Sequence, residues 1–299
     1  MGDRMNRKST LFIAGLLGVV GAFSVASAYA VTPQSPIAWG ERWKKLPATP
    51  APVAALKSGY ASVNGIQLYY ATVGQGEPVV LLHGGLANSD YWGQQVAALA
   101  KHHKVIVVDS RGHGRSTRDA RPYSYDLMSD DVVALLDHLK IAKADIVGWS
   151  DGGIIGIDLA IRHPTRVNRI FSFAPNTKTS GVKPDTEKNP VFASYIERAG
   201  NEYRKLSKTP DQYDAFVEQI SHMWGTQPNW SDEDLKKINT AVLIVDGDHD
   251  EAIVREHLEY IANTIPNAGL LILPNTSHFA FIQAPKEFNE AILNFIDYK

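Results

Sequence analysis

The chain of 299 residues contains no cysteine. This absence excludes disulfide bonds, thiolate metal sites and an acylated lipoprotein cysteine, so an exported form would depend on its core for stability. The chain also lacks a marked excess of either charge, because 30 basic and 32 acidic residues give a formal net charge of −2. A nucleic-acid-binding protein usually carries a basic face, so we expect no nucleic-acid partner.

Internal repeats and HExxH-like zinc motifs are missing as well. One stretch, Asp246-x-Asp248-x-Asp250, has the carboxylate spacing with which a calcium loop begins. Such a loop needs glycine at its sixth position and glutamate at its twelfth, where this chain has Glu251 and His257. We therefore expect no metal ion, and no other cofactor is indicated.

An apolar run lies close to the N-terminus. Basic residues precede the run at 11–23, and the small residues of 24–30 follow it and end in an A-x-A pattern. This order is typical of a secretory signal peptide, here with cleavage after Ala30, and predicts an exported protein, periplasmic or secreted. Cleavage after Ala28 is an alternative. An uncleaved membrane anchor is another, because 11–30 would just reach across a bilayer if it were all apolar. After cleavage we expect no membrane association.

Residues 31–57 form a proline-rich segment between this signal and the expected domain. They contain five prolines and two tryptophans, Trp39 and Trp43. Such a composition predicts an extended linker or arm. The two indole rings are candidates to attach it to the domain surface.

Gly148-Trp149-Ser150-Asp151-Gly152 is a G-x-S-x-G sequence between an expected strand at 144–147 and an expected helix at 154–162. At such a junction the pattern predicts a nucleophile elbow, a sharp turn that exposes the serine hydroxyl. The flanking glycines avoid collisions with neighbouring backbone. The amides that follow Ser150 begin a helix, whose positive end favours a developing oxyanion.

A serine hydroxyl is a weak nucleophile near neutral pH and needs a base that is oriented by an acid. Two later apolar strands, 241–246 and 269–273, end in polar residues, where parallel sheets build their sites. The second strand leads to His278, which we expect to be the base; His249 is its nearest rival. The first strand leads to three candidate acids, Asp246, Asp248 and Asp250.

From about Gly59 to Tyr298 the chain resembles the α/β-hydrolase family. The resemblance rests on five signals in the family's order: His83-Gly84-Gly85 after the strand 79–82, a D-x-R-G-x-G-x-S loop at 109–116, the elbow, Gly247-x-x-Asp250, and His278. It implies that Asp250 is the orienting acid. It also implies that the backbone amides of Gly85 and Asp151 form the oxyanion hole.

The expected fold is therefore α/β, with a mostly parallel eight-stranded sheet flanked by helices and a helical cap insertion. We place the core at 58–175 and 240–299, where apolar strands alternate with amphipathic helices. An Asn64-Gly65 pair predicts a hairpin at the edge of the sheet. Between the two core segments, at 176–239, the alternation of strands and helices stops and aromatic residues recur at helical spacing. This pattern predicts the cap over the active site.

Within the family, the sequence Gly-Trp-Ser-Asp-Gly-Gly at 148–153 is similar to the biphenyl-hydrolase-like or valacyclovir-hydrolase group. These proteins are serine esterases, and some act on amino-acid esters. By this resemblance the Asp151 carboxylate could attract a cationic substrate group; alternatively it only compensates the helix dipole. Trp149 and Trp224 are the other expected substrate contacts.

These features predict a serine hydrolase that cleaves a carboxylic ester, or a related acyl bond, of a small molecule through Ser150, His278 and Asp250. Lactonase, peptidase, C–C bond hydrolase and cofactor-free perhydrolase chemistry stay open on the same residues. A non-catalytic protein that binds a small ligand on the hydrolase scaffold is an alternative of another class, since a fold alone does not establish catalysis. The sequence does not indicate an oligomeric state.

Overall fold

The computed structural model describes residues 40–298. The expected signal peptide, 1–30, and the start of the expected arm, with Trp39, lie outside the described residues. Between residues 40 and 298, no helix is long and apolar enough to cross a membrane.

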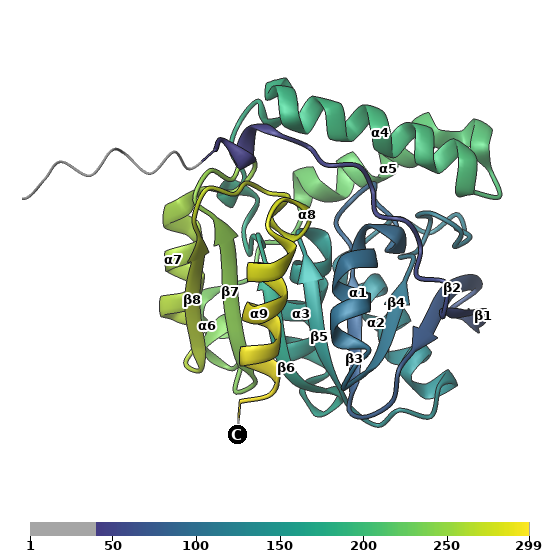
Figure 1. The fold of residues 1–299 in the computed structure, drawn as a ribbon, viewed down its shortest axis with the longest axis horizontal. Coiled ribbons are helices and arrows are strands. Elements are labelled where there is room, and N and C mark those ends of the chain that lie inside the picture. The colour runs from purple at the N-terminus through teal and green to yellow at the C-terminus, as the bar shows by residue number, and fades with distance from the viewer. Residues whose placement is uncertain (1–39, 299) are drawn as a thin grey trace, which may run out of the picture. The chain divides into compact units, whose positions relative to one another are not determined.

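The described residues form an eight-stranded sheet in the order β1-β2-β4-β3-β5-β6-β7-β8 (Figure 1). β1 and β2 pair antiparallel with their neighbours, and all other neighbours pair in parallel. This confirms the mostly parallel eight-stranded sheet that the sequence predicts. The strands are β1 (Lys57–Val63), β2 (Ile66–Val73), β3 (Pro78–Leu82), β4 (Lys104–Val108), β5 (Ala144–Trp149), β6 (Val167–Phe173), β7 (Ala241–Gly247) and β8 (Ala268–Leu273).

The burial of each strand follows from what covers it. β5 is buried along its whole length, and β3 and β4 are buried except for their first residue, because helices lie on both faces. The outer strand β1 alternates between exposed and buried positions toward its end. Asn64 and Gly65 join β1 to β2 with φ angles of 43° and 79°, the positive values that a type I′ hairpin turn requires.

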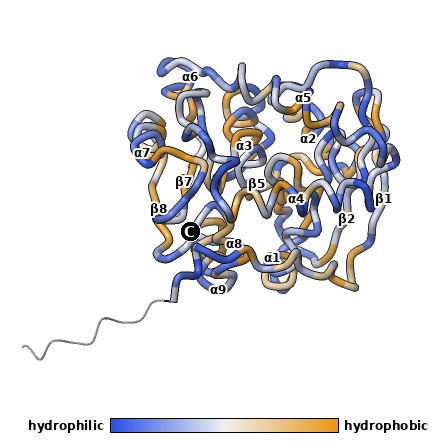
Figure 2. The backbone as a smooth tube through the Cα atoms, turned by 90° about the horizontal axis from the view of Figure 1, so that it is seen from above, coloured by the Kyte–Doolittle hydropathy of each residue, from blue (hydrophilic) through white to orange (hydrophobic). Residues whose placement is uncertain are grey.

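Helices cover the two faces of the sheet. Figure 2 shows α1 (Gly93–Leu99) and α9 (Pro285–Ile296) on one side of the row of strands, and α2 (Tyr125–His138) and α3 (Asp151–Arg162) on the other. Each helix turns an apolar stripe inward; in α9 the buried residues are Phe288, Ile292 and Ile296. The remaining core helices are the short α8 (Ala280–Gln283) and α7 (Arg255–Thr264).

The chain between β6 and β7 is mainly helical and contains α4 (Pro190–Leu206), α5 (Tyr213–Thr226) and α6 (Asp232–Lys236). In Figure 1, α4 and α5 cross above the sheet. Several aromatic side chains of this segment pack against one another. The rings of Tyr203 and Phe216, for example, stack with their centroids 5.0 Å apart. These internal contacts hold α4 and α5 together as one unit.

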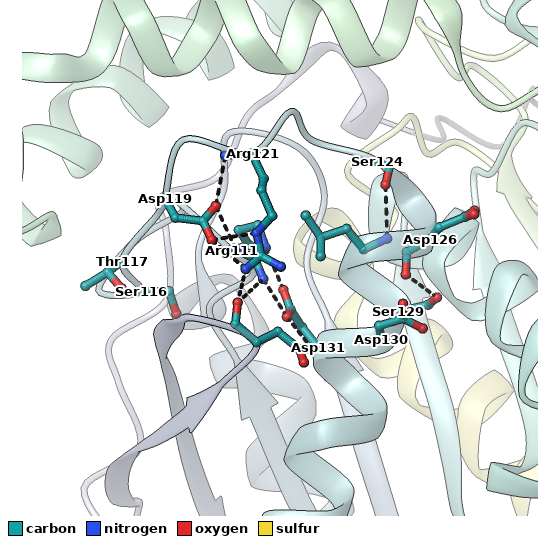
Figure 3. Close-up of polar contacts among 12 residues, drawn as sticks. Arg111, Ser116, Thr117, Asp119, Arg121, Ser124, Asp126, Ser129, Asp130 and Asp131 are labelled. Carbon is teal, nitrogen blue, oxygen red and sulfur yellow. Dashed lines mark hydrogen bonds and ion pairs between the residues drawn. The ribbon is translucent and has the colours of Figure 1, made fainter.

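The loop that follows β4 is held in place by a buried ion pair (Figure 3). The guanidinium of Arg111 donates to both carboxylate oxygens of Asp131 on α2, at 2.8 and 2.7 Å. Both residues are almost fully buried. Burial raises the pKa of the Asp131 carboxyl above its ordinary value, against the opposing effect of Arg111. Without Arg111, this carboxylate would be left buried and without its cation.

Replacement of Arg111 by alanine is therefore expected to destabilise the protein by about 3–5 kcal/mol, the usual effect of removing one partner of a buried ion pair. Urea unfolding followed by circular dichroism measures the change. Arg121→Ala is the matched control, because Arg121 bonds to Asp119 on the same loop but is about half exposed. Similar, small changes in both variants would contradict a structural role for the Arg111–Asp131 pair.

Candidate active site

Ser150 lies in the sharp turn between β5 and α3. Its backbone has φ 54° and ψ −117°, a conformation that a residue with a side chain adopts only at a cost in strain. Two hydrogen bonds fix it: the Ser150 amide donates to the Phe173 carbonyl at 2.8 Å, and the Ile154 amide donates to the Ser150 carbonyl at 2.9 Å. The turn therefore holds Ser150 in a strained and defined position at the start of α3.

The turn has no room for side chains at its two glycines. A Cβ on Gly148 would lie 2.1 Å from the Gly152 carbonyl oxygen, and a Cβ on Gly152 would lie 2.0 Å from the Leu82 carbonyl oxygen. Backbone atoms cannot yield as the end of a flexible side chain can. The two glycines of the G-x-S-x-G pattern are thus required by the close approach of β5, α3 and β3.

His278 and Asp250 form a buried pair. The Nδ1 atom of His278 lies 2.6 Å from Oδ2 of Asp250, and both side chains are 2% exposed. The other Asp250 oxygen accepts the backbone amides of Ala252 and Ile253, at 2.6 and 2.7 Å. The ionised carboxylate accepts a hydrogen bond from the ring, which places the hydrogen on Nδ1 and leaves Nε2 of His278 as the basic nitrogen.

The charges of this pair stabilise each other. Burial by itself would raise the pKa of Asp250, but the attraction and hydrogen bond of His278 lower it to about 2. Burial likewise opposes protonation of His278, yet the Asp250 carboxylate raises the pKa of the ring above its ordinary value of 6.5. Asp250 is therefore ionised at neutral pH, and His278 is a stronger base than a free histidine.

The two other candidate acids occupy different environments. Asp246 is buried at the end of β7, where burial and the neighbouring charge of Asp250 raise its pKa well above the ordinary value and favour the neutral form. Asp248 accepts the Thr276 amide at 3.1 Å and lies 2.8 Å from the ring of His249. The structure thus pairs His278 with Asp250, while Asp248 links the two loops that carry this pair.

Gly85 follows β3 on a loop that His83 braces. The ring of His83 contacts the Gly84 carbonyl through Nδ1 at 2.7 Å and accepts the Ser110 amide through Nε2 at 3.0 Å. Burial lowers the pKa of His83, which favours this neutral form with one donor and one acceptor nitrogen. Both ring nitrogens are used, so His83 fixes the loop in front of Ser150 and has no proton to exchange.

A pocket of about 280 Å³ is lined by the expected site residues other than Asp250, which reaches it only through its contact with His278. Its wall includes Ser150 and His278 with Gly85 and Asp151, which the sequence proposes for the oxyanion hole. Trp149 also belongs to the wall, but its ring is 1% exposed and packs on Phe281 with centroids 4.5 Å apart, so it supports the pocket from the core side. The cap completes the enclosure with Phe192, Tyr195, Ile196, Trp224 and Gln227.

The Asp151 carboxylate lies in the pocket wall and accepts two hydrogen bonds. Tyr125 donates its hydroxyl at 2.9 Å, and Trp224 donates its indole N–H at 2.9 Å. Burial raises the pKa of Asp151 to about 6, although both donors favour the ionised form. This carboxylate also stands in the first turn of α3, so its position suits the dipole of that helix as well as a cationic ligand.

Sequence reasoning did not single out Tyr125, Phe192 or Tyr195 as pocket residues. Phe192 and Tyr195 recur at helical spacing, a pattern equally typical of residues that pack inside the cap. Tyr125 begins α2 and reaches Asp151 only through the folding of the core.

Among residues 40–298, no cluster of three or more histidine, aspartate or glutamate side chains is arranged to hold a metal ion.

Comparisons with known proteins agree with this architecture. The model of the protein family described as "alpha/beta hydrolase fold" matches residues 77–212. A solved structure titled "Est816 as an N-Acyl homoserine lactone degrading enzyme" is 30% identical, with a TM-score of 0.64, over 79% of this chain and 100% of that one. The chain belongs to the α/β-hydrolase family.

Two curated relatives match this α/β-hydrolase over most of their length. "Serine hydrolase BPHL" of Homo sapiens is 26% identical over 81% of this chain and 87% of that protein. "3-oxoadipate enol-lactonase 2" of Acinetobacter baylyi is 29% identical over 76% of this chain and 92% of that protein. The first belongs to the group that the sequence at 148–153 resembles.

The His278–Asp250 pair predicts a specific pH dependence. A general base must be unprotonated, so kcat/KM should fall as the pH drops through a pKa above 6.5, the ordinary histidine value from which that of His278 is raised. Asp250→Asn removes the charge that raises this pKa and should shift the acid limb to lower pH. It should also reduce kcat by about 10³–10⁴-fold, because the ring loses its orientation and its counter-charge.

The pH profile of ester hydrolysis by the parent and by Asp250→Asn measures both effects. Asp248→Asn is the matched control, since Asp248 bonds to Thr276 and does not contact His278. An acid limb that stays in place in Asp250→Asn would contradict the assignment of Asp250 as the partner of the base.

Proposed function

We propose that this α/β-hydrolase cleaves a carboxylic ester or lactone of a small molecule by acyl transfer to Ser150. The observation that carries the proposal is the convergence of a strained, glycine-flanked serine and a buried His278–Asp250 pair on one pocket. A serine in this position serves no evident structural purpose that would offset its strain. Strain of this kind concentrates at functional sites.

In the first step His278 accepts the proton of the Ser150 hydroxyl through Nε2 as the serine oxygen attacks the substrate carbonyl. Asp250 keeps the ring oriented and stabilises the imidazolium that forms. The negative charge of the tetrahedral intermediate lies against the backbone amides of Gly85 and Asp151. A donor of this kind contributes about 3–4 kcal/mol to the stability of the transition state.

The first half of the cycle ends when His278 gives its proton to the leaving alcohol and the acyl group stays on Ser150. The second half repeats the proton transfers with water. A water molecule then loses a proton to His278 and attacks the acyl carbonyl. The bond between the acyl group and the Ser150 oxygen breaks, and His278 returns the proton to that oxygen as the acid leaves.

On the cap side the pocket wall has an apolar part, which includes Phe192, Ile196 and Trp224, and a polar part, which includes Lys183 and Glu187. The apolar part suits an apolar acyl or alcohol group.

Two of the similar proteins described above are named for lactones, which supports the inclusion of lactones in the proposal. A lactone undergoes the same acyl transfer, but its alcohol stays attached to the acyl group. Cleavage of a C–C bond and perhydrolysis need the same nucleophile and base. A ligand-binding protein without turnover differs from all of these, because it would not transfer an acyl group to Ser150.

Covalent labelling with a fluorophosphonate separates an acyl-transfer enzyme from a binding protein. We expect one phosphonyl group per chain on Ser150, and none on Ser150→Ala, by intact mass and peptide mapping. A panel of p-nitrophenyl esters and lactones should show turnover that falls at least about 10³-fold in Ser150→Ala. A protein that binds a small ligand tightly but is neither labelled nor active would support the binding protein.

A second proposal concerns the substrate group that Asp151 contacts. Its ionised carboxylate, buried in the pocket wall, would favour a substrate that carries a cation, such as an α-amino ester, over a neutral ester. The attraction is present above the Asp151 pKa of about 6 and is lost as the pH falls through it.

Asp151→Asn keeps hydrogen-bond acceptance from Trp224 and removes the charge. The ratio of kcat/KM for matched α-amino and neutral esters should then fall by about tenfold, the effect of about 1.4 kcal/mol of lost interaction. Effects on the common base cancel in this ratio, so its pH dependence reports on Asp151. An equal ratio in parent and variant would contradict this proposal. Asp151 would then only compensate the dipole of α3.

We also propose that the protein is exported to the periplasm or secreted, on the signal-like pattern at residues 1–30.

A further inference from the structure

Residues 40–50, named the strap here, connect the two loops that carry the catalytic pair with helix α4 of the cap. In Figure 1 the dark segment after the grey trace runs below α4 and above α8 toward β1. It contains a short turn of 3-10 helix, Arg42–Lys44, and otherwise has no regular secondary structure. Its contacts fall into two groups, one at each end.

The first end of the strap bonds to the loop that carries His278. The Arg42 amide donates to the side chain of Asn275 at 3.2 Å. Gln283 donates to the Lys45 carbonyl at 2.8 Å and accepts the Ser277 amide at 2.8 Å through its other side-chain atom. Because Ser277 precedes His278, Gln283 joins the strap to the residue next to the proposed base.

The same end also contacts the turn that carries Asp250. The indole of Trp43 stacks on the ring of His249, with centroids 4.4 Å apart and an angle of 13° between the planes. His249 directly precedes Asp250. The strap therefore lies against both loops on which the proposed acid and base stand.

The second end of the strap bonds to α4. The guanidinium of Arg198 donates to two successive carbonyls, those of Leu46 at 3.0 Å and Pro47 at 2.5 Å. The Thr49 hydroxyl donates to Glu202, one turn further along α4, at 2.5 Å. The other oxygen of Glu202 accepts from Asn88 of the core at 3.0 Å. These charged hydrogen bonds are stronger than neutral ones.

The core is shaped to receive the strap. A Cβ on Gly93, the first residue of α1, would lie 2.8 Å from the side chain of Pro50 and 2.9 Å from the Ala51 carbonyl oxygen. The chain thus passes so close to α1 that only glycine fits beneath it. Leu46 packs on the hydrophobic core from the strap. Such close packing distinguishes the strap from a loosely attached linker.

The residues of α4 that bond to the strap lie about one turn further along the helix than the residues that line the pocket. Phe192, Tyr195 and Ile196 form part of the pocket wall, and Arg198 follows on the next turn. The Tyr195 hydroxyl donates to the carbonyl of Gly85, on the proposed oxyanion loop. A shift of α4 would therefore move aromatic side chains relative to Ser150 and change the space available to a substrate.

We propose that the strap, held by Arg198, fixes helix α4 over the nucleophile and so limits the size of the substrate that the pocket admits. Arg198 is then a positioning residue for specificity that does not touch the substrate itself. The size limit rests on the proposed function, since it assumes that the pocket binds the substrate. The fixing of α4 does not depend on that assumption.

Hydrogen–deuterium exchange and ester kinetics on the full-length protein test the two parts. Arg198→Ala removes both carbonyl contacts, and Arg198→Lys keeps the charge without the paired geometry. Lys205→Ala is the matched control, because Lys205 lies on α4 but is exposed. We expect amides of α4 to exchange about tenfold faster in Arg198→Ala, with an intermediate rate in Arg198→Lys and the parent rate in Lys205→Ala.

The kinetic readout compares p-nitrophenyl octanoate with p-nitrophenyl acetate. In Arg198→Ala the ratio of kcat/KM for the long ester to that for the short one should rise by about threefold or more, because α4 no longer restricts the pocket. Unchanged amide exchange in α4 of Arg198→Ala would overturn the proposal that the strap fixes this helix. Faster exchange with an unchanged ratio would overturn the size limit. Absence of all esterase activity in the parent would instead contradict the proposed function, while the exchange result would still test the strap.

Discussion

The site depends on one local constraint, the strained turn at Ser150. The close approach of β3, β5 and α3 leaves no space for side chains at Gly148 and Gly152, and hydrogen bonds on both sides hold the serine backbone at φ 54°. The packed sheet supplies the energy that this conformation requires. Because the turn cannot relax, the hydroxyl and the amides at the start of α3 keep a fixed relation to the pocket.

Around this fixed point, burial gives similar carboxyl groups different chemical properties. Asp250 is ionised because His278 and two backbone amides stabilise its charge. Asp246, four residues earlier, has a pKa well above the ordinary value because it is buried beside Asp250. Asp151 has a pKa of about 6, between these extremes, and faces the pocket. The environment, more than the residue type, sets the protonation of each carboxyl group. On this basis we propose Asp250 as the acid that orients the base and Asp151 as the carboxylate available to a substrate.

The sequence predicts the α/β-hydrolase fold because its strongest signals are local. Buried parallel strands such as β3 and β5 are short apolar runs, and their ends carry the polar residues of the site. The proposed roles of Ser150 and His278 came from the same strand ends, while the choice of Asp250 among three candidate acids came from the resemblance to the family. The residues of the pocket wall were harder to predict from the sequence. An aromatic residue such as Tyr195 has the same helical spacing whether it packs inside the cap or faces Ser150. Attachment of the arm that includes the strap was predicted only at its tryptophans, of which Trp43 stacks on His249. The bonds from Arg198 to backbone carbonyls were not predictable, because such bonds leave no mark in a sequence.

A crystal structure of the full-length protein after reaction with a p-nitrophenyl phosphonate would test the central claim most directly. We predict phosphorus bonded to the Ser150 oxygen, a phosphonyl oxygen within hydrogen-bond distance of the Gly85 and Asp151 amides, and Nε2 of His278 facing the adduct. An adduct on another residue, or a His278 ring directed away from Ser150, would contradict the proposed acyl-transfer site.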